Sequence, residues 1–134
     1  MKIVFSDVWF YVALMHAGDE HHVRVAAWFR AFTGRFVTTR PVLTEVANGL
    51  AAPRFRNRVA ALMLRLENDP KVRIVGNSDA LYTRGLTLYA QRPDKEWSLT
   101  DCMSFVVMRE EGIREALTRD HHFTQAGFEP IFAG

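Results

Sequence analysis

The stretch at residues 97–111, WSLTDCMSFVVMREE, constrains the fold of this chain more than any other. Ser98 and Asp101 have the S-x-x-D spacing of a capping box, the pattern that begins a helix. The run from Cys102 to Met108 is apolar except for Ser104, so the predicted helix has no polar face. A helix that is apolar on all sides has to be buried between other layers of the fold. Asp101 is then a carboxylate at the mouth of a buried helix, where it either caps the helix or belongs to a functional site.

Short apolar runs alternate with helical patterns along the whole chain. Strands alternating with helices are typical of a parallel sheet that is covered on both faces. The sequence therefore predicts an α/β fold, a three-layer α/β/α sandwich around a mainly parallel sheet of four to five strands, in one domain over residues 1–134. The expected strands are residues 2–7, 35–38, 72–75, 114–118 and 129–132, and the helical patterns cover residues 9–15, 19–32, 42–50, 55–66, 81–89, 98–111 and 121–126.

The composition is that of an ordinary globular protein, with 49% hydrophobic and 24% charged residues. No apolar segment reaches the roughly 18 residues that a membrane-spanning helix needs. The N-terminus lacks the layout of a signal peptide. The single cysteine, Cys102, lies in the predicted buried helix, so we expect a core thiol rather than a disulfide. These features predict a cytoplasmic protein without a membrane partner.

The net charge is +2, and most of the basic residues are arginines. Arginine pairs bidentately with phosphate, so this usage is compatible with an anionic partner. A genomic bias toward arginine would give the same composition. The charge alone therefore leaves both explanations open.

Four carboxylates can meet at one edge of the predicted sheet. Asp7 directly follows the first strand, and Asp120 follows the strand at residues 114–118 in the same way. Asp101 lies in the first turn of its helix, and Glu45 lies near the start of the helix after the second strand. In an open parallel sheet, ligands bind outside the carboxyl ends of the strands. Each acid taken singly is equally compatible with a cap, a turn or a solvated helix position.

A shared position for these acids is costly unless they bind a cation. Carboxylates that approach one another in a low dielectric repel and raise their own pKa values. A divalent cation removes this penalty, and hard oxygen ligands suit Mg²⁺ or Mn²⁺. Such ions activate water and stabilise charge on a phosphoryl group. The chemistry predicted for the cluster is metal-assisted hydrolysis of a phosphodiester.

Two segments resemble the PIN-domain proteins, and specifically the VapC-type ribonuclease toxins of bacterial toxin–antitoxin pairs. These segments are DKEWSLTDC at residues 94–102 and LTRDHHFTQAGF at residues 117–128. The strand that ends in Asp7 and the helix around Glu45 match the family more loosely. The resemblance extends over nearly the whole chain and implies a PIN-like fold.

The resemblance also implies roles for the four acids. Asp7, Glu45, Asp101 and Asp120 would be the catalytic quartet, with Asp7, Asp101 and Asp120 as metal ligands. The implied cofactor is Mg²⁺, with Mn²⁺ as a substitute, and the implied substrate is RNA. Family members are usually homodimers that a cognate antitoxin protein holds inactive. The chain would then be the toxin of a type II pair that inhibits translation and growth.

The chain departs from the family directly after the first acid. A hydroxyl or small residue is common there, whereas this chain has Val8-Trp9. A hydrogen bond that supports Asp7 would then come from Ser6 or Thr118. Thr100 and Thr118 each closely precede an acid of the quartet, so they either steer its carboxylate or cap the local backbone.

Histidines and arginines add further candidates. His121 and His122 follow Asp120, and we expect one of the two, with His121 as the site candidate, to contact RNA phosphate or to lie beside the metal site, unless both are surface residues. No spacing of the five histidines supplies a complete zinc site. The densest basic run is Arg54, Arg56 and Arg58, which is either a solvated helix face or a contact for RNA or the antitoxin.

The three tryptophans, Trp9, Trp28 and Trp97, all lie in apolar contexts. We therefore expect them to make core or dimer contacts rather than to stack on bases.

Two other classes of function compete with the nuclease. A non-catalytic PIN-like module would bind RNA or protein, but the presence of all four acids argues against a decayed site. A phosphomonoesterase of the haloacid-dehalogenase type also has an Asp after its first strand. That class needs a second Asp where this chain has Trp9, and it needs a late lysine, whereas no lysine follows Lys95.

Overall fold

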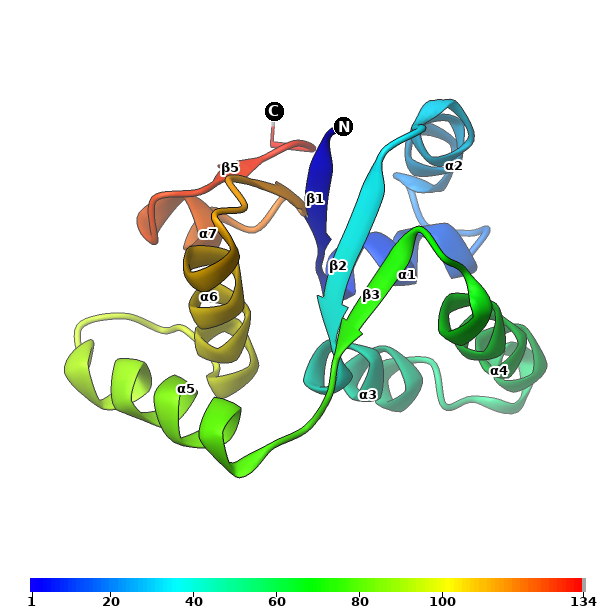
Figure 1. Cartoon of the computed structure of the whole chain (residues 1–134). Helices are drawn as coiled ribbons and strands as arrows, with labels where there is room; N and C mark the ends of the chain where they lie inside the picture. Colours follow the sequence, from blue (N-terminus) through cyan, green and yellow to red (C-terminus); the bar gives the residue numbers. More distant parts are fainter. Residues whose placement is uncertain (134) are drawn as a thin grey trace.

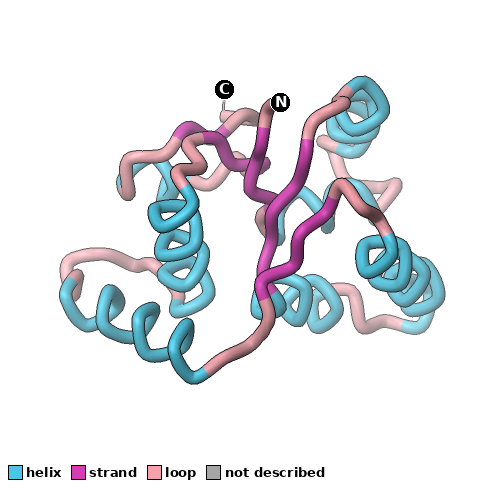
Figure 2. Tube along the Cα trace, viewed as in Figure 1, coloured by secondary structure: helices cyan, strands magenta, loops and turns pink. Residues whose placement is uncertain are grey.

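Five short strands form the centre of the protein (Figures 1 and 2), whose computed structural model describes residues 1–133. The strands lie in the order β3-β2-β1-β4-β5, and each neighbouring pair is parallel. Val4 and Phe5 of the central strand are fully buried, as expected for a parallel strand that is covered on both faces. The strands are β1 (Ile3–Ser6), β2 (Arg35–Thr39), β3 (Val72–Val75), β4 (Glu115–Leu117) and β5 (Glu129–Pro130).

Seven helices within residues 1–133 surround the sheet. In Figure 1, α5, α6 and α7 lie on one side of the strands, and α1, α2 and α4 lie on the other. This arrangement confirms the predicted α/β/α sandwich. The helices are α1 (Val8–Met15), α2 (His22–Ala31), α3 (Arg40–Gly49), α4 (Pro53–Asn68), α5 (Asp79–Gln91), α6 (Leu99–Glu111) and α7 (His121–Gln125). None of these helices is long and apolar enough to cross a membrane.

Helix α6 is the capped, buried helix that its sequence predicts. The Ser98 hydroxyl accepts a hydrogen bond from the Asp101 N–H, and the Asp101 carboxylate accepts one from the Ser98 N–H. Gly112 ends the helix in the left-handed conformation, with φ of 67°. Helix α5 packs closely against α6 at Gly85, where a Cβ would clash with the Met103 side chain. The buried residues of α6 are Cys102, Met103, Ser104, Phe105, Val107 and Met108.

Several elements are shorter than the sequence suggests, and the differences are largest at α2 and β5. Helix α2 begins at His22, whereas the helical pattern predicted from the sequence begins at residue 19. The Asp19 carboxylate instead accepts a hydrogen bond from the His21 N–H at 2.8 Å, which stabilises the turn before the helix. The last strand ends at Pro130 rather than at residue 132, although the Ile131 N–H still bonds to the Ala116 carbonyl at 2.9 Å. Proline supplies no N–H to the ladder.

The order of the strands creates a switch point beside β1. From β1 the chain moves outward through β2 to β3, and it then crosses to β4 on the other side of β1. The carboxyl ends of β1 and β4 therefore flank a crevice, which is where open α/β sheets bind ligands. Asp7 follows β1, and Thr118 follows β4, so the topology brings these residues to the same crevice.

Candidate functional site

A single hydroxyl links the acids at the ends of β1 and β4. The Thr118 Oγ1 atom donates to Asp7 Oδ2 at 2.9 Å and accepts from the Asp120 N–H at 3.0 Å. Of the two donors that the sequence offered for Asp7, Thr118 is therefore the one that binds it. Ser6 is fully buried, and its carbonyl accepts a hydrogen bond from Thr38 at 2.8 Å. Thr118 orients the Asp7 carboxylate and at the same time fixes the backbone at Asp120.

Asp7 is a buried carboxylate, with 6% of its surface exposed. Burial, together with the negative charges of Asp101 and Asp120, raises its pKa from 3.8 to about 7. Hydrogen bonds from Val8 and Thr118 oppose this shift. At neutral pH the group is therefore close to half ionised, and a cation nearby would favour its charged form.

Asp101 caps α6 and also lines the pocket of the other acids. Its Oδ2 atom accepts the capping hydrogen bond from the Ser98 N–H at 3.2 Å and lies 3.2 Å from His122 Nδ1. Burial raises the pKa of Asp101, and the nearby charge of Asp120 adds to this effect. The hydrogen bonds from Ser98 and His122 work in the opposite direction. The carboxylate thus caps α6 and also faces the other acids.

Asp120 caps α7 and turns His122 toward the acids. Its Oδ1 atom accepts from the His122 N–H at 2.9 Å and lies 3.4 Å from His122 Nδ1. The His122 side chain is 18% exposed, whereas that of His121 is 74% exposed and lies 3.7 Å from Asp120. The sequence favoured His121, but His122 is the histidine that bridges Asp101 and Asp120. The sequence did not distinguish the two histidines, because His121 and His122 both lie within two residues of Asp120.

Glu45 reaches the cluster from α3 and is held by Thr100. The Thr100 Oγ1 atom donates to Glu45 Oε1 at 3.2 Å, and Glu45 is exposed. Steering of Asp101, the acid next to it in sequence, was one of the two roles expected of Thr100, and its hydroxyl instead donates to Glu45. The Thr118 hydroxyl likewise donates to an acid that is distant in sequence, Asp7, rather than to the carboxylate of Asp120. Each threonine orients an acid on a different element.

The four acids line one open pocket of about 590 Å³, a size that is common for ligand sites. The carboxylate of Glu96 also lines it, as do two cationic or titratable side chains, Arg119 and His122. Trp9 forms part of the wall. Sequence reasoning missed Arg119 and Glu96. Arg119 lies between Thr118 and Asp120, just after β4. The rule that ligands bind at the carboxyl ends of the strands, which selected Asp120, would therefore have selected Arg119 too.

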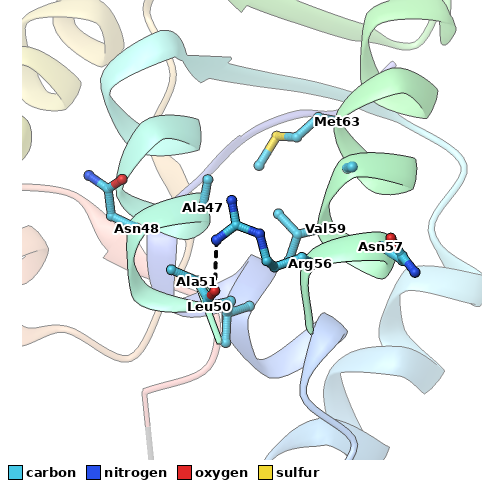
Figure 3. A pocket seen from close by; sticks show the side chains of 9 residues that line it. Ala47, Asn48, Leu50, Ala51, Arg56, Asn57, Val59 and Met63 are labelled. Carbon is cyan, nitrogen blue, oxygen red and sulfur yellow. Dashed lines mark hydrogen bonds between the residues drawn. The ribbon is translucent and has the colours of Figure 1, made fainter. Parts of the chain in front are cut away.

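The arginine run of α4 lies outside this pocket. Arg56 donates from Nη1 to the Ala51 carbonyl at 2.9 Å, and it lines a separate pocket between α3 and α4 (Figure 3). The Arg54 guanidinium lies 4.7 Å from the centre of the Phe55 ring. Arg54 and Arg58 are exposed, and neither lines the acidic pocket. Contact of these arginines with RNA therefore stays a prediction.

The profile of the PIN domain matches residues 5–129, nearly the whole chain. The chain belongs to the PIN domain family. This membership confirms the resemblance on the segments around Asp101 and Asp120, and it agrees with the observed sandwich. In the PIN domain described above, all four acids of the predicted quartet line the same pocket.

Relatives of known activity and structure extend over the full length of the chain. The chain is 29% identical over 129 residues to proteins from two strains of Mycobacterium tuberculosis named 23S rRNA-specific endonuclease VapC20. The match covers 96% of this chain and 98% of the relative. The crystal structure of Mycobacterium tuberculosis VapC20, described as a sarcin–ricin loop cleaving toxin, superposes with a TM-score of 0.85 at 26% identity. It too covers 96% of this chain and 98% of the other.

More distant structures share the fold alone. FitAcB from Neisseria gonorrhoeae gives a TM-score of 0.61 at 20% identity, covering 95% of this chain and 94% of the other. FitAB bound to a DNA fragment gives 0.63 at 17% identity, covering 96% and 93%. The PIN fold is thus retained at low sequence identity.

Proposed function

We propose that the protein is a metal-dependent endoribonuclease that hydrolyses phosphodiester bonds of RNA. The observation that carries this proposal is the convergence of Asp7, Asp101 and Asp120 on one pocket, where burial raises the pKa of Asp7 to about 7. Carboxylates gathered in this way repel one another and weaken the fold unless a cation binds among them. A metal ion therefore explains the cluster better than a structural role does.

The donors of the pocket fit a hard divalent cation. Asp7, Asp101 and Asp120 would hold it, since Mg²⁺ prefers carboxylate oxygens and Mn²⁺ accepts the same ligands. Each of the three carboxylates is already oriented by a hydrogen bond from the chain. When bound, the ion would lower the pKa of a water ligand and stabilise negative charge on the phosphoryl group.

Glu45 would orient the attacking water and accept its proton. It enters the pocket from α3 and is exposed, in contrast to the buried Asp7. Thr100 restricts its side chain by the hydrogen bond to Oε1. This hydrogen bond would hold the carboxylate where it can accept a proton from that water, the role of a general base.

RNA is the substrate that the relatives support. The similar VapC20 is named an endonuclease specific for 23S ribosomal RNA, and the likeness to it covers nearly the whole of both chains. We therefore propose 23S ribosomal RNA as the first substrate to test. Cleavage of such an RNA would inhibit translation and growth, the effect expected of the toxin of a type II toxin–antitoxin pair acting in the cytoplasm.

A cognate antitoxin and a second copy of the chain are the proposed protein partners. Helix α5 carries Tyr82, Leu86 and Tyr89 on one face, because residues separated by three or four positions lie side by side on a helix. These side chains are 52%, 43% and 51% exposed. An exposed apolar stripe of this kind is suited to a homodimer contact. The antitoxin would be the product of a neighbouring small gene that encodes a DNA-binding protein.

Cleavage of purified 23S ribosomal RNA tests the activity. The wild-type protein should cleave in Mg²⁺, stop in excess EDTA and recover when Mg²⁺ is restored. Asp7→Asn should be folded and inactive, whereas Glu129→Gln, which removes an exposed acid on β5, should keep full activity. Robust cleavage by a folded double variant, Asp7→Asn with Asp101→Asn, would exclude the acids as the catalytic group.

A non-catalytic PIN-like module that binds RNA or protein is the alternative, and thermal unfolding separates the two. A ligand that binds only the folded state raises its melting temperature. Mn²⁺ should therefore raise the Tm of the wild-type protein and not that of Asp7→Asn. A module without a metal site would show the same Tm with and without Mn²⁺ and would leave every RNA intact.

A further inference from the structure

The acidic pocket needs cations of its own to accept RNA. Its wall contains Asp7, Glu45, Glu96, Asp101 and Asp120, and all five carboxylates repel the phosphates of a nucleic acid. A metal ion at the acids would offset this repulsion at the scissile phosphate only. The neighbouring phosphates require a positive group at the rim of the same pocket.

Arg119 is that group. It lies between Thr118 and Asp120, is exposed and lines the pocket. Its Nη1 atom lies 2.6 Å from His21 Nε2, and a guanidinium can only donate, so the His21 nitrogen accepts. The contact joins the loop after β4 to the turn before α2.

The turn before α2 holds His21 in place for this contact. The His21 N–H donates to the Asp19 carboxylate at 2.8 Å. The Glu20 carboxylate lies 3.0 Å from His21 Nε2 but is 83% exposed, so water screens its charge. The contact with His21 therefore orients the Arg119 guanidinium at the rim of the pocket. Its planar fork matches a phosphate group.

Trp9 provides an aromatic surface next to Arg119. Its ring lies 5.4 Å from the His21 ring and 5.3 Å from the ring of Phe132, which is almost fully buried. Trp9 itself is half-buried and forms part of the pocket wall. Trp9 thus makes the core contact that was one of the two expectations for it, and it also lines the pocket. One part of the indole packs inward, and the rest borders the acids.

We propose that Trp9 and Arg119 form a nucleotide-binding subsite for single-stranded RNA beside the acidic cluster. Arg119 binds the phosphate that neighbours the scissile one, and the indole of Trp9 stacks on the adjoining base. His21 serves as the positioning residue for both. Stacking on an aromatic ring accepts any base, so this subsite supplies affinity and places the backbone rather than reading sequence. The subsite rests on the proposed nuclease function and extends it to substrate recognition.

Two variants of Trp9 separate stacking from packing. Trp9→Phe keeps a π face, whereas Trp9→Leu keeps apolar bulk without one. The probe is a fluorescein-labelled RNA hairpin that carries the sarcin–ricin loop, with Ca²⁺ in place of Mg²⁺ for binding and Mg²⁺ for cleavage. Trp9→Leu should weaken binding by about 5- to 150-fold, the range for loss of one stacked base. Trp9→Phe should recover most of the affinity, and the Tm of each variant reports folding.

Salt dependence isolates the phosphate contact. Each phosphate neutralised on a single strand contributes about 0.7 to the slope of log affinity against log salt. Arg119→Gln should therefore reduce the magnitude of this slope by about 0.7, and it should raise the KM for cleavage with a smaller effect on kcat. Arg114→Gln, which removes an exposed arginine at the opposite edge of the sheet, is the matched control and should leave the slope unchanged.

The outcomes distinguish the subsite from the nuclease activity. If the wild-type protein cleaves the hairpin and folded Trp9→Leu and Arg119→Gln bind it with unchanged affinity and slope, the subsite is wrong and the nuclease stands. If the wild-type protein binds without cleaving, the nuclease fails, and the affinities of the variants still decide the subsite. A wild-type protein that does not bind the hairpin would overturn the subsite and the choice of this RNA as substrate, and the cleavage assay on other RNAs would then decide the nuclease.

Discussion

Replacement of Asp7 by Asn should stabilise the metal-free protein, and more so at high pH. Burial, aided by the charges of Asp101 and Asp120, raises the pKa of Asp7 from 3.8 to about 7. Between these two values the folded protein holds a proton that the unfolded chain releases. The free energy of unfolding of the wild type therefore falls as the pH rises from about 4 to about 7 and is level above that. Asparagine cannot ionise, so the free energy of unfolding of Asp7→Asn does not fall with pH for this reason.

The size of the stability difference between Asp7→Asn and the wild type follows from the shift in the pKa of Asp7. One pKa unit corresponds to about 1.36 kcal/mol, and the interval between pH 5 and pH 7 contains about two units. The stability difference between Asp7→Asn and the wild type should thus grow by about 3 kcal/mol from pH 5 to pH 8. This comparison removes any constant effect of the amide on packing, because such an effect is the same at both pH values.

Urea denaturation in EDTA at pH 5 and pH 8 measures this difference. Glu129→Gln is the control, since the loss of one exposed carboxylate should change stability by no more than about 0.5 kcal/mol at either pH. Addition of Mn²⁺ at pH 8 should raise the stability of the wild type above its metal-free value and leave Asp7→Asn unchanged. A difference that stays constant between pH 5 and pH 8 in EDTA would refute the claim that burial raises the pKa of Asp7.

Three further predictions concern the residues that orient the acids. Thr118→Val should lower the free energy of unfolding by about 2–4 kcal/mol, because Asp7 Oδ2 and the Asp120 N–H both lose their hydrogen bond to the hydroxyl. Urea denaturation measures this loss of stability, and Thr118→Ser, which keeps the hydroxyl, should retain most of the wild-type stability. Asp101→Asn should cost at most about 1 kcal/mol through the helix dipole and yet abolish most cleavage; a destabilised but active variant would reduce Asp101 to a helix cap. His122→Asn should weaken Mn²⁺ binding in calorimetry by disordering Asp101 and Asp120, and unchanged affinity would show that the bridge between them is dispensable.

The local sequence determined the elements of this PIN domain and the positions of its acids. The spacing of Ser98 and Asp101 and the apolar run after them specify a capped, buried α6, because capping and helical periodicity act over a few residues. Alternation of short apolar runs with helices specifies a parallel sheet. The rule that ligands bind at the carboxyl ends of such strands was then enough to select Asp7 and Asp120.

Only the tertiary structure decided which side chains support the acids. The Thr118 hydroxyl bonds to Asp7 across 111 residues, and Thr100 bonds to Glu45 across 55. Arg119 meets His21 across 98 residues in the same way. Propensity, capping and periodicity describe neighbours along the chain, so they left Ser6 and Thr118 equally possible as donors to Asp7 and gave no sign of the bond between Thr100 and Glu45. The actual partners depend on the order of the strands, because the pairing of β1 with β4 sets which hydroxyl reaches which carboxylate.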